Sequence, residues 1–91
     1  MIYIDKVSFK RIEAVQWTGE NIYEISYFVR TSVTCLSKCS NGSVRIHTRR
    51  GVLTVPKDGY IAEEKVNGIC RHKVYSQDKF EQAYEQKERK L

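Results

Sequence analysis

The stretch that decides the fold is residues 40–62, which read SNGSVRIHTRRGVLTVPKDGYIA. Within it, short runs at 43–48, 52–55 and 60–62 are rich in β-branched residues, as is typical of strands. Residues with turn chemistry separate these runs: each break contains a glycine, and 56–59 combines a proline with an Asp-Gly pair. Strands joined by such short turns pair antiparallel, so the stretch predicts an antiparallel sheet.

Further strands are expected on both sides of this stretch. Residues 7–17 have the β-branched and aromatic composition of a strand, and residues 33–37 are expected to form a short strand. Asn67-Gly68 predicts a tight hairpin turn that leads into another strand at 69–75. The sheet therefore extends over most of the chain.

Two helices complete the expected fold. Asn21 is a suitable N-cap, with Glu24 as its reciprocal partner, for a helix at about 21–30. Ser76 or Asp78 is expected to cap a second helix near the end of the chain. The apolar faces of the two helices are Ile22, Ile25, Phe28 and Val29 in the first, and Phe80, Ala83 and Tyr84 in the second.

The expected element order is β-α-β-β-β-β-β-α. It predicts an α+β fold, with a curved antiparallel sheet or partial barrel on which two helices pack. Residues 1–91 are expected to form a single domain, with a frayed C-terminal tail from about residue 86.

Length and charge limit the classes of function. A chain of 91 residues is too short for a two-domain enzyme, and its thin core would gain from assembly into a homo-oligomer. Lys and Arg number 16 against 11 Asp and Glu, and the resulting net charge of +5 favours anionic partners. No signal peptide or membrane-spanning run is recognised, so we expect a cytoplasmic protein.

The strongest candidate binding feature is a basic strand around residue 47. Because side chains alternate along a strand, Arg45, His47 and Arg49 are expected to share one face and could bind phosphate or carboxylate. The alternative is that they form the solvent face of an amphipathic strand. Arg71 and Lys73, followed by Tyr75, form a second basic stripe, which could lie on the same sheet as the first.

Three further residues are candidates for contact with a nucleotide base. Trp17 could stack on a base, with the neighbouring Gln16 amide to read its edge, and Tyr60 is a further candidate for contact with the base. The alternative for Trp17 is a core anchor, since a small core needs its large side chains.

The other chemically distinctive residues point to no reaction. Cys35 and Cys39 are spaced unlike a zinc knuckle, so they and Cys70 are better interpreted as buried structural thiols than as metal ligands. No nucleophile elbow, phosphate loop or His-Glu-x-x-His motif is present. We therefore expect no enzyme activity, no metal and no cofactor.

The order of motifs resembles that of a widespread family of small phage and prophage proteins. The resemblance begins with residues 12–21, IEAVQWTGEN, and continues through the Ile-rich helix and residues 44–48 to Phe80 and Tyr84-Glu85. It covers about residues 7–85. The chain departs from the family pattern at 58–60, where Asp-Gly-Tyr replaces Gly-Asp-aromatic, and in the region 35–41.

The resemblance implies a phage accessory protein without established catalytic residues, and suggests a role against bacterial defence. The leading prediction is a protein that sequesters an anionic nucleotide immune signal, as anti-CBASS and anti-Thoeris proteins do, in the host cytoplasm. Arg45, His47 and Arg49 would hold phosphates, and Gln16, Trp17 or Tyr60 would contact the base. The alternatives are a direct protein inhibitor of a defence complex, as anti-CRISPR proteins are, and a basic nucleic-acid-binding accessory protein.

Overall fold

The computed structural model describes residues 1–29, 33–48 and 51–86. Arg49, the predicted turn at Arg50 and the predicted tail beyond residue 86 lie outside these residues. In chain order the elements are β1 (Ile2–Asp5), β2 (Arg11–Gln16), α1 (Ile22–Val29), β3 (Val33–Lys38), β4 (Val44–Thr48), β5 (Gly51–Val55), β6 (Tyr60–Val66), β7 (Ile69–Tyr75), α2 (Gln77–Ala83) and β8 (Tyr84–Gln86).

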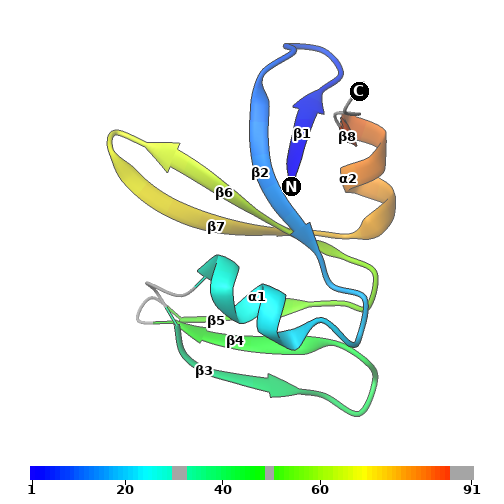
Figure 1. Ribbon diagram of the computed structural model, residues 1–91, viewed down its shortest axis with the longest axis vertical. Helices are drawn as coiled ribbons and strands as arrows, with labels where there is room; N and C mark the ends of the chain where they lie inside the picture. The colour runs from blue at the N-terminus through cyan, green and yellow to red at the C-terminus, as the bar shows by residue number, and fades with distance from the viewer. Residues whose placement is uncertain (30–32, 49–50, 87–91) are drawn as a thin grey trace.

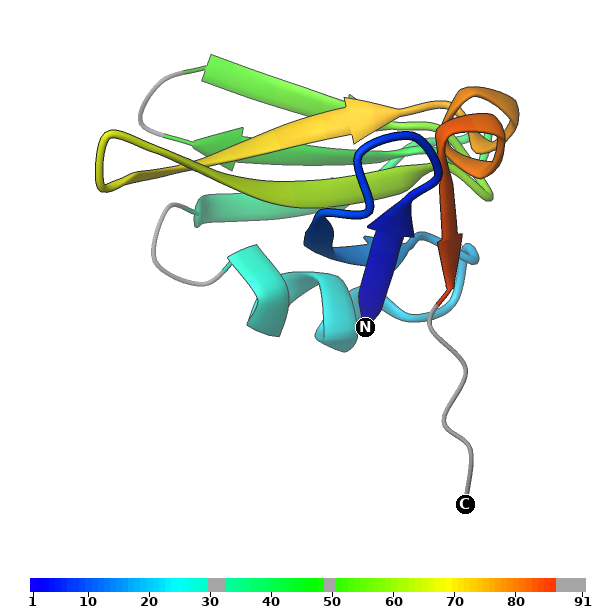
Figure 2. The same cartoon turned by 90° about the horizontal axis from the view of Figure 1, so that it is seen from above.

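The strands form two antiparallel sheets, one of five strands in the order β7-β6-β2-β1-β8 and one of three in the order β3-β4-β5 (Figure 1). Neither sheet closes into a barrel. Helix α1 lies on one side of the molecule, and β5 and β7 lie on the opposite side (Figure 2). The α+β fold with a curved antiparallel sheet is thus confirmed.

The first and last strands were not expected from the sequence. β1 pairs with β2 and with β8, and the strand predicted at 7–17 begins only at Arg11. The reason is a turn built by Asp5, whose Oδ1 accepts the backbone N–H groups of Val7 at 2.8 Å and Ser8 at 3.0 Å. Phe9 in the same turn has a positive φ of 59°, which a strand does not allow.

The predicted turn residues make the turns expected of them. Asn67 and Gly68 both have positive φ, 53° and 78°, as a two-residue hairpin requires. In the turn after β5, Asp58 takes the left-handed conformation, with φ of 68°. Gly59 is needed there for space, since a Cβ on it would lie 2.9 Å from the backbone oxygens of Pro56 and Tyr75.

The main core lies between the two sheets and α1. Its fully buried members come from five elements and from the residue after β2. They are Val15, Trp17, Ile25, Val29, Val44, Ile46, Val55 and Ile61. The predicted apolar stripe of the first helix is confirmed, since Ile25 and Val29 are buried and Ile22 and Phe28 pack at the edge of this core.

A second, aromatic core lies under α2, on the opposite face of the five-stranded sheet. Successive side chains of a strand point to opposite faces of the sheet. Ile61 therefore belongs to the main core and its neighbour Ala62 to the aromatic core. Phe80 is fully buried and stacks on Tyr60 at 4.1 Å between ring centroids. The predicted face of the second helix is partly wrong, because Ala83 is exposed and Tyr84 begins β8. The N-cap of α2 is Ser76, which is one of the two predicted candidates.

The start of α1 is tied to the end of β2 by Asn21. Its Nδ2 donates to the Gln16 carbonyl at 2.8 Å and to Glu24 Oε1 at 2.7 Å, while its Oδ1 accepts the N–H of Thr18. Asn21 and Glu24 therefore pair through their side chains, and not through the side chain–backbone bonds of the predicted capping box. In the described part of the chain, neither helix has the length and apolar character needed to cross a membrane.

Candidate functional site

Arg45 and His47 lie on the outer face of the three-stranded sheet. The alternating neighbours Val44 and Ile46 are fully buried, so the predicted alternation is confirmed for residues 44–47. Arg45 lies opposite Ser37 of β3 and Thr54 of β5, and His47 lies opposite Cys35 and Val52. We call these six residues the outer face.

The outer face carries only part of the predicted anion site. Arg45 is exposed and His47 is half-buried, whereas Arg49 lies outside the described residues. A hollow of about 530 Å³ lies elsewhere, between the β1–β2 turn and β6, and neither Arg45 nor His47 lines it. Arg45 and His47 are therefore placed together on an open sheet face.

Trp17 is a core residue. Only 1% of it is exposed, and its indole Nε1–H donates to the backbone carbonyl of Gly42 at 2.8 Å. A ring enclosed in this way has no free face for a base to stack on. The core-anchor alternative is confirmed, and the predicted ligand contact of Trp17 is wrong.

Tyr60 and Gln16 are also engaged inside the fold. Tyr60 is 5% exposed, and its hydroxyl donates to Glu81 Oε2 at 2.7 Å. Burial, with the Glu81 carboxylate beside it, raises the pKa of Tyr60 well above its usual value. The Gln16 Nε2 donates to the Asp58 carbonyl at 3.0 Å. The predicted base contact through Tyr60 is therefore wrong. The hydrogen bond from Gln16 stabilises the turn after β5.

No family model, curated protein or solved structure matches this chain. The resemblance to small phage proteins thus stays a prediction, and the function has to be argued from the molecule itself.

The second basic stripe does not join the first. Arg71 and Lys73 lie on β7 in the five-stranded sheet, whereas Arg45 lies on β4 in the three-stranded sheet. Arg71 is directly opposite Glu64 and Lys73 is opposite Ala62, on the face that carries the aromatic core. The expectation that the two stripes share one sheet is wrong, because the chain between 55 and 60 leads from one sheet to the other.

The cysteines are more accessible than the sequence suggested. Cys35 and Cys70 are exposed and Cys39 is half-buried, and all three are free thiols. The prediction of buried structural thiols is wrong for Cys35 and Cys70. Cys35 lies on the outer face of the three-stranded sheet, and Cys70 is exposed beside the turn between β6 and β7. Within residues 1–29, 33–48 and 51–86, no group of three His, Cys, Asp or Glu side chains could hold a metal ion.

Among the described residues, His72 has a buried side-chain nitrogen without a hydrogen-bond partner. Its side chain is 7% exposed, and Nε2 has no hydrogen-bond partner among the described residues, with Glu63 Oε2 4.0 Å away. Burial lowers the pKa of His72, while the Glu63 carboxylate and a hydrogen bond with the Phe28 backbone act in the opposite direction. The hydrogen bond with the Phe28 backbone links His72 of β7 to the end of α1.

The hollow forms where the five-stranded sheet divides. β2 and β6 pair only as far as Glu13 and Glu63, and beyond that point the two hairpins diverge (Figure 1). Charges of both signs line it, namely Lys10, Arg11 and Lys65 with Asp5, Glu13, Glu63 and Glu64. This mixed lining selects no class of ligand.

The sequence reasoning missed two tyrosines on α1. Tyr23 is 86% exposed and Tyr27 is 72% exposed, four residues apart on the side of the helix away from the main core. Their spacing could have predicted this exposure, because residues four apart share a helical face and the apolar stripe of this helix lies on the other side. They form an aromatic surface, which we call the tyrosine pair.

Proposed function

We propose that this protein acts by binding another protein directly, without catalysing a reaction. The observation that carries the proposal is the tyrosine pair on α1. Tyrosine is enriched at protein interfaces because its ring supplies apolar contact area and its hydroxyl a hydrogen bond. A single exposed aromatic residue needs no explanation, but two at a spacing of four residues share one face of the helix.

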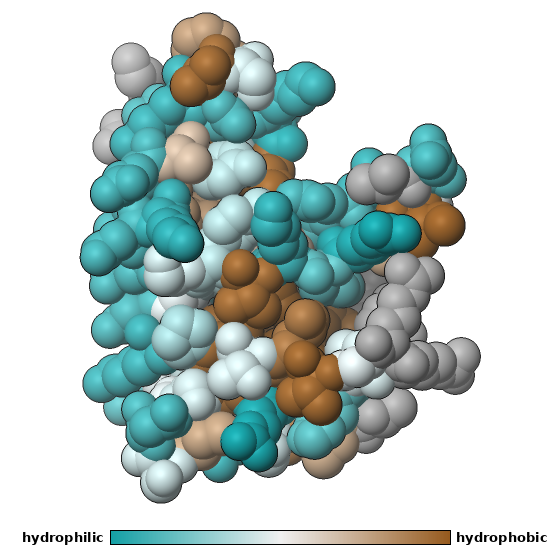
Figure 3. Space-filling view, turned by 180° about the vertical axis from the view of Figure 1, so that it is seen from behind, coloured by the Kyte–Doolittle hydropathy of each residue, from teal (hydrophilic) through white to brown (hydrophobic). Residues whose placement is uncertain are grey.

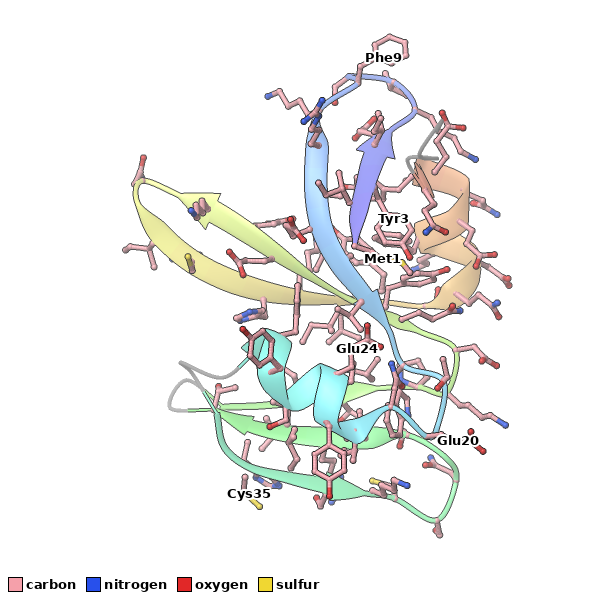
Figure 4. All side chains as sticks on the ribbon, in the orientation of Figure 1. Met1, Tyr3, Phe9, Glu20, Glu24 and Cys35 are labelled. Atoms are coloured by element: carbon pink, nitrogen blue, oxygen red, sulfur yellow. The ribbon has the colours of Figure 1, made fainter. Side chains whose placement is uncertain are left out.

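The helix supports the tyrosine pair as a rigid platform. Ile25 and Val29 fix its opposite side in the main core, and Asn21 fixes its first turn to β2. An ordered helix loses little conformational entropy on binding, which favours affinity. Glu24 lies in the first turn of the helix and Glu20 in the segment just before it (Figure 4), so a partner with basic groups beside an apolar pocket would complement this end of α1.

The resemblance to small phage proteins suggests the class of partner. We propose a component of a bacterial defence complex, met in the host cytoplasm, as the resemblance implied for a direct inhibitor. Binding alone would suffice for inhibition if the bound face of the partner carries its active site or assembly surface.

The test is a comparison of three proteins bound to a matrix and incubated with host lysate. The wild type is expected to retain a specific host protein that the double variant Tyr23→Ala/Tyr27→Ala loses. Phe9→Ala is the matched control, since Phe9 is 77% exposed but lies in the β1–β2 turn. Equal retention by the wild type and the double variant would overturn the role of the tyrosine pair.

A second candidate function, capture of an anionic nucleotide-like ligand, is favoured by the shared face of Arg45 and His47. Calorimetry against cyclic nucleotides and ADP-ribose-type compounds tests it, with Arg45→Ala/His47→Ala as the variant. Heat that disappears in this variant would support anion capture. Binding to nucleic acid instead would weaken steeply with added salt.

A further inference from the structure

Strand β7 is an open edge of the five-stranded sheet. All seven of its residues, Ile69–Tyr75, pair with β6 on one side, and no described strand pairs with it on the other. β5 approaches β7 near Tyr75, but the two strands diverge toward the β6–β7 turn (Figure 1). The half of the edge nearest that turn therefore presents backbone groups with which no described strand pairs.

The geometry of the β6–β7 turn determines which backbone groups of β7 point to the open edge. A two-residue hairpin closes with a hydrogen-bonded pair, here Val66 and Ile69, and hydrogen-bonded pairs then alternate along the ladder. The N–H and C=O groups of Cys70 and His72 consequently point away from β6. These are the groups that an added strand would use.

The side chains of β7 alternate in character. Arg71 and Lys73 are exposed on one face of the sheet, while His72 and Val74 face the main core on the other. Glu64 lies opposite Arg71, but its carboxylate accepts a hydrogen bond from Tyr75 and forms no ion pair with the described part of the chain. The Lys73 ammonium lies over the Tyr75 ring, 5.3 Å from its centroid, but Arg71 and Lys73 are both exposed, so their positive charge can be reached by a partner.

An apolar surface continues from this edge. On the side of the molecule opposite α1, a hydrophobic patch lies where β5 and β7 run (Figure 3). The half-buried apolar side chains Leu53 and Val74 belong to these two strands and pack against the main core. An added strand would therefore meet charge on one of its faces and apolar surface on the other.

These features discriminate between possible occupants. A second copy pairing antiparallel through the same edge would bring Arg71 and Lys73 of both copies onto one face, where like charges repel. A strand with acidic residues at alternate positions would instead place carboxylates beside both cations, with its apolar residues on the core side.

We propose that the open edge of β7 binds an extended segment of a partner protein in which acidic and apolar residues alternate. The inference rests on the proposed function, since it assumes a protein partner, but it uses a surface separate from the tyrosine pair. The segment would add a sixth strand beside β7, with backbone hydrogen bonds to Cys70 and His72.

The probe is a synthetic peptide of about eight residues that alternates valine and glutamate, the length of an ordinary strand. Titration of isotope-labelled protein by nuclear magnetic resonance is expected to shift the amide signals of residues 70–74. The same peptide with lysine in place of glutamate is expected to bind at least about tenfold more weakly, through charge repulsion.

Two pairs of variants locate the site. Arg71→Glu/Lys73→Glu is expected to weaken binding of the acidic peptide about tenfold, whereas Lys10→Glu/Lys79→Glu, with the same change in net charge, keeps it. Cys70→Pro removes one outward N–H and is expected to weaken binding, while Cys70→Ala keeps that N–H and serves as its control.

Three outcomes would overturn the inference: no binding of the acidic peptide, shifts outside β7, or self-association of the protein that Arg71→Glu/Lys73→Glu alters. A host protein retained by the tyrosine pair without any peptide binding would overturn the β7 site alone. Peptide binding at β7 with no effect of Tyr23→Ala/Tyr27→Ala on partner capture would overturn only the tyrosine pair.

Discussion

The indole N–H of Trp17 donates a hydrogen bond of 2.8 Å to the backbone carbonyl of Gly42. This bond joins the end of β2 to the turn between β3 and β4, so it connects the two sheets. Trp17, a candidate from the sequence for stacking on a base, thus holds the two sheets together instead.

Replacement of Trp17 by Phe tests this connection. The variant leaves the Gly42 carbonyl without its donor and a cavity in the main core, so we expect a loss of about 2–3 kcal/mol in the free energy of unfolding. Urea denaturation measures it. Tyr23→Ala, at an exposed position, should change stability by less than about 0.5 kcal/mol. A Trp17→Phe protein as stable as the wild type would contradict this assignment.

Gly59 is expected to tolerate no side chain. A Cβ there would lie 2.9 Å from the Pro56 and Tyr75 backbone oxygens, which have little freedom to move. Gly59→Ala should cost about 2 kcal/mol or more by thermal unfolding. The control is Gly68→Ala, where a Cβ meets nothing within 4 Å and only the positive φ is unfavourable. We expect a cost of about 1 kcal/mol there, and equal costs would refute the steric argument.

His72 should make the protein less stable in acid. Because burial lowers its pKa in the folded state, the unfolded chain binds a proton more readily. Its stabilising contribution is therefore present above the ordinary pKa of 6.5 and is lost as the pH falls below it. His72→Phe should flatten the decline in unfolding free energy between pH 7.5 and 5. If His72→Phe lost stability in acid as steeply as the wild type, His72 would not be the source of the decline.

Tyr60 should make the protein less stable in alkali. Its pKa is raised in the folded state, so its contribution is present below the ordinary pKa of 10 and is lost as the pH rises above it. Tyr60→Phe should reduce the alkaline decline in stability, and should cost about 1 kcal/mol at neutral pH through the lost hydrogen bond to Glu81. If Tyr23→Phe, at an exposed position, reduced the alkaline decline equally, Tyr60 would not be its source.

The sequence predicted correctly those elements that depend mainly on neighbouring residues in the chain. The helix at 21–30 follows from the spacing of its apolar residues, and the Asn67-Gly68 turn follows from its two positive φ angles. β1 and β8 were missed because each is short and is defined mainly by its pairing partner. Neither has a long enough alternating run to be recognised alone.

The candidate site was predictable only in part, for a related reason. Alternation along β4 correctly placed Arg45 and His47 on one face. Which aromatic residues are buried depends on packing between distant elements, and Tyr60 is covered by Phe80 of α2. A motif in sequence does not show which of its large side chains the remaining chain will cover.

The pairing of β1 with β8 has a consequence for synthesis on the ribosome. Tyr3 is paired with Gln86, so the edge of the five-stranded sheet stays incomplete until nearly all of the described chain has been translated. Until then the nascent polypeptide exposes aromatic surface that Phe80 later covers. Such distant pairings slow the final folding step, and chaperones would have their main opportunity to bind during that interval.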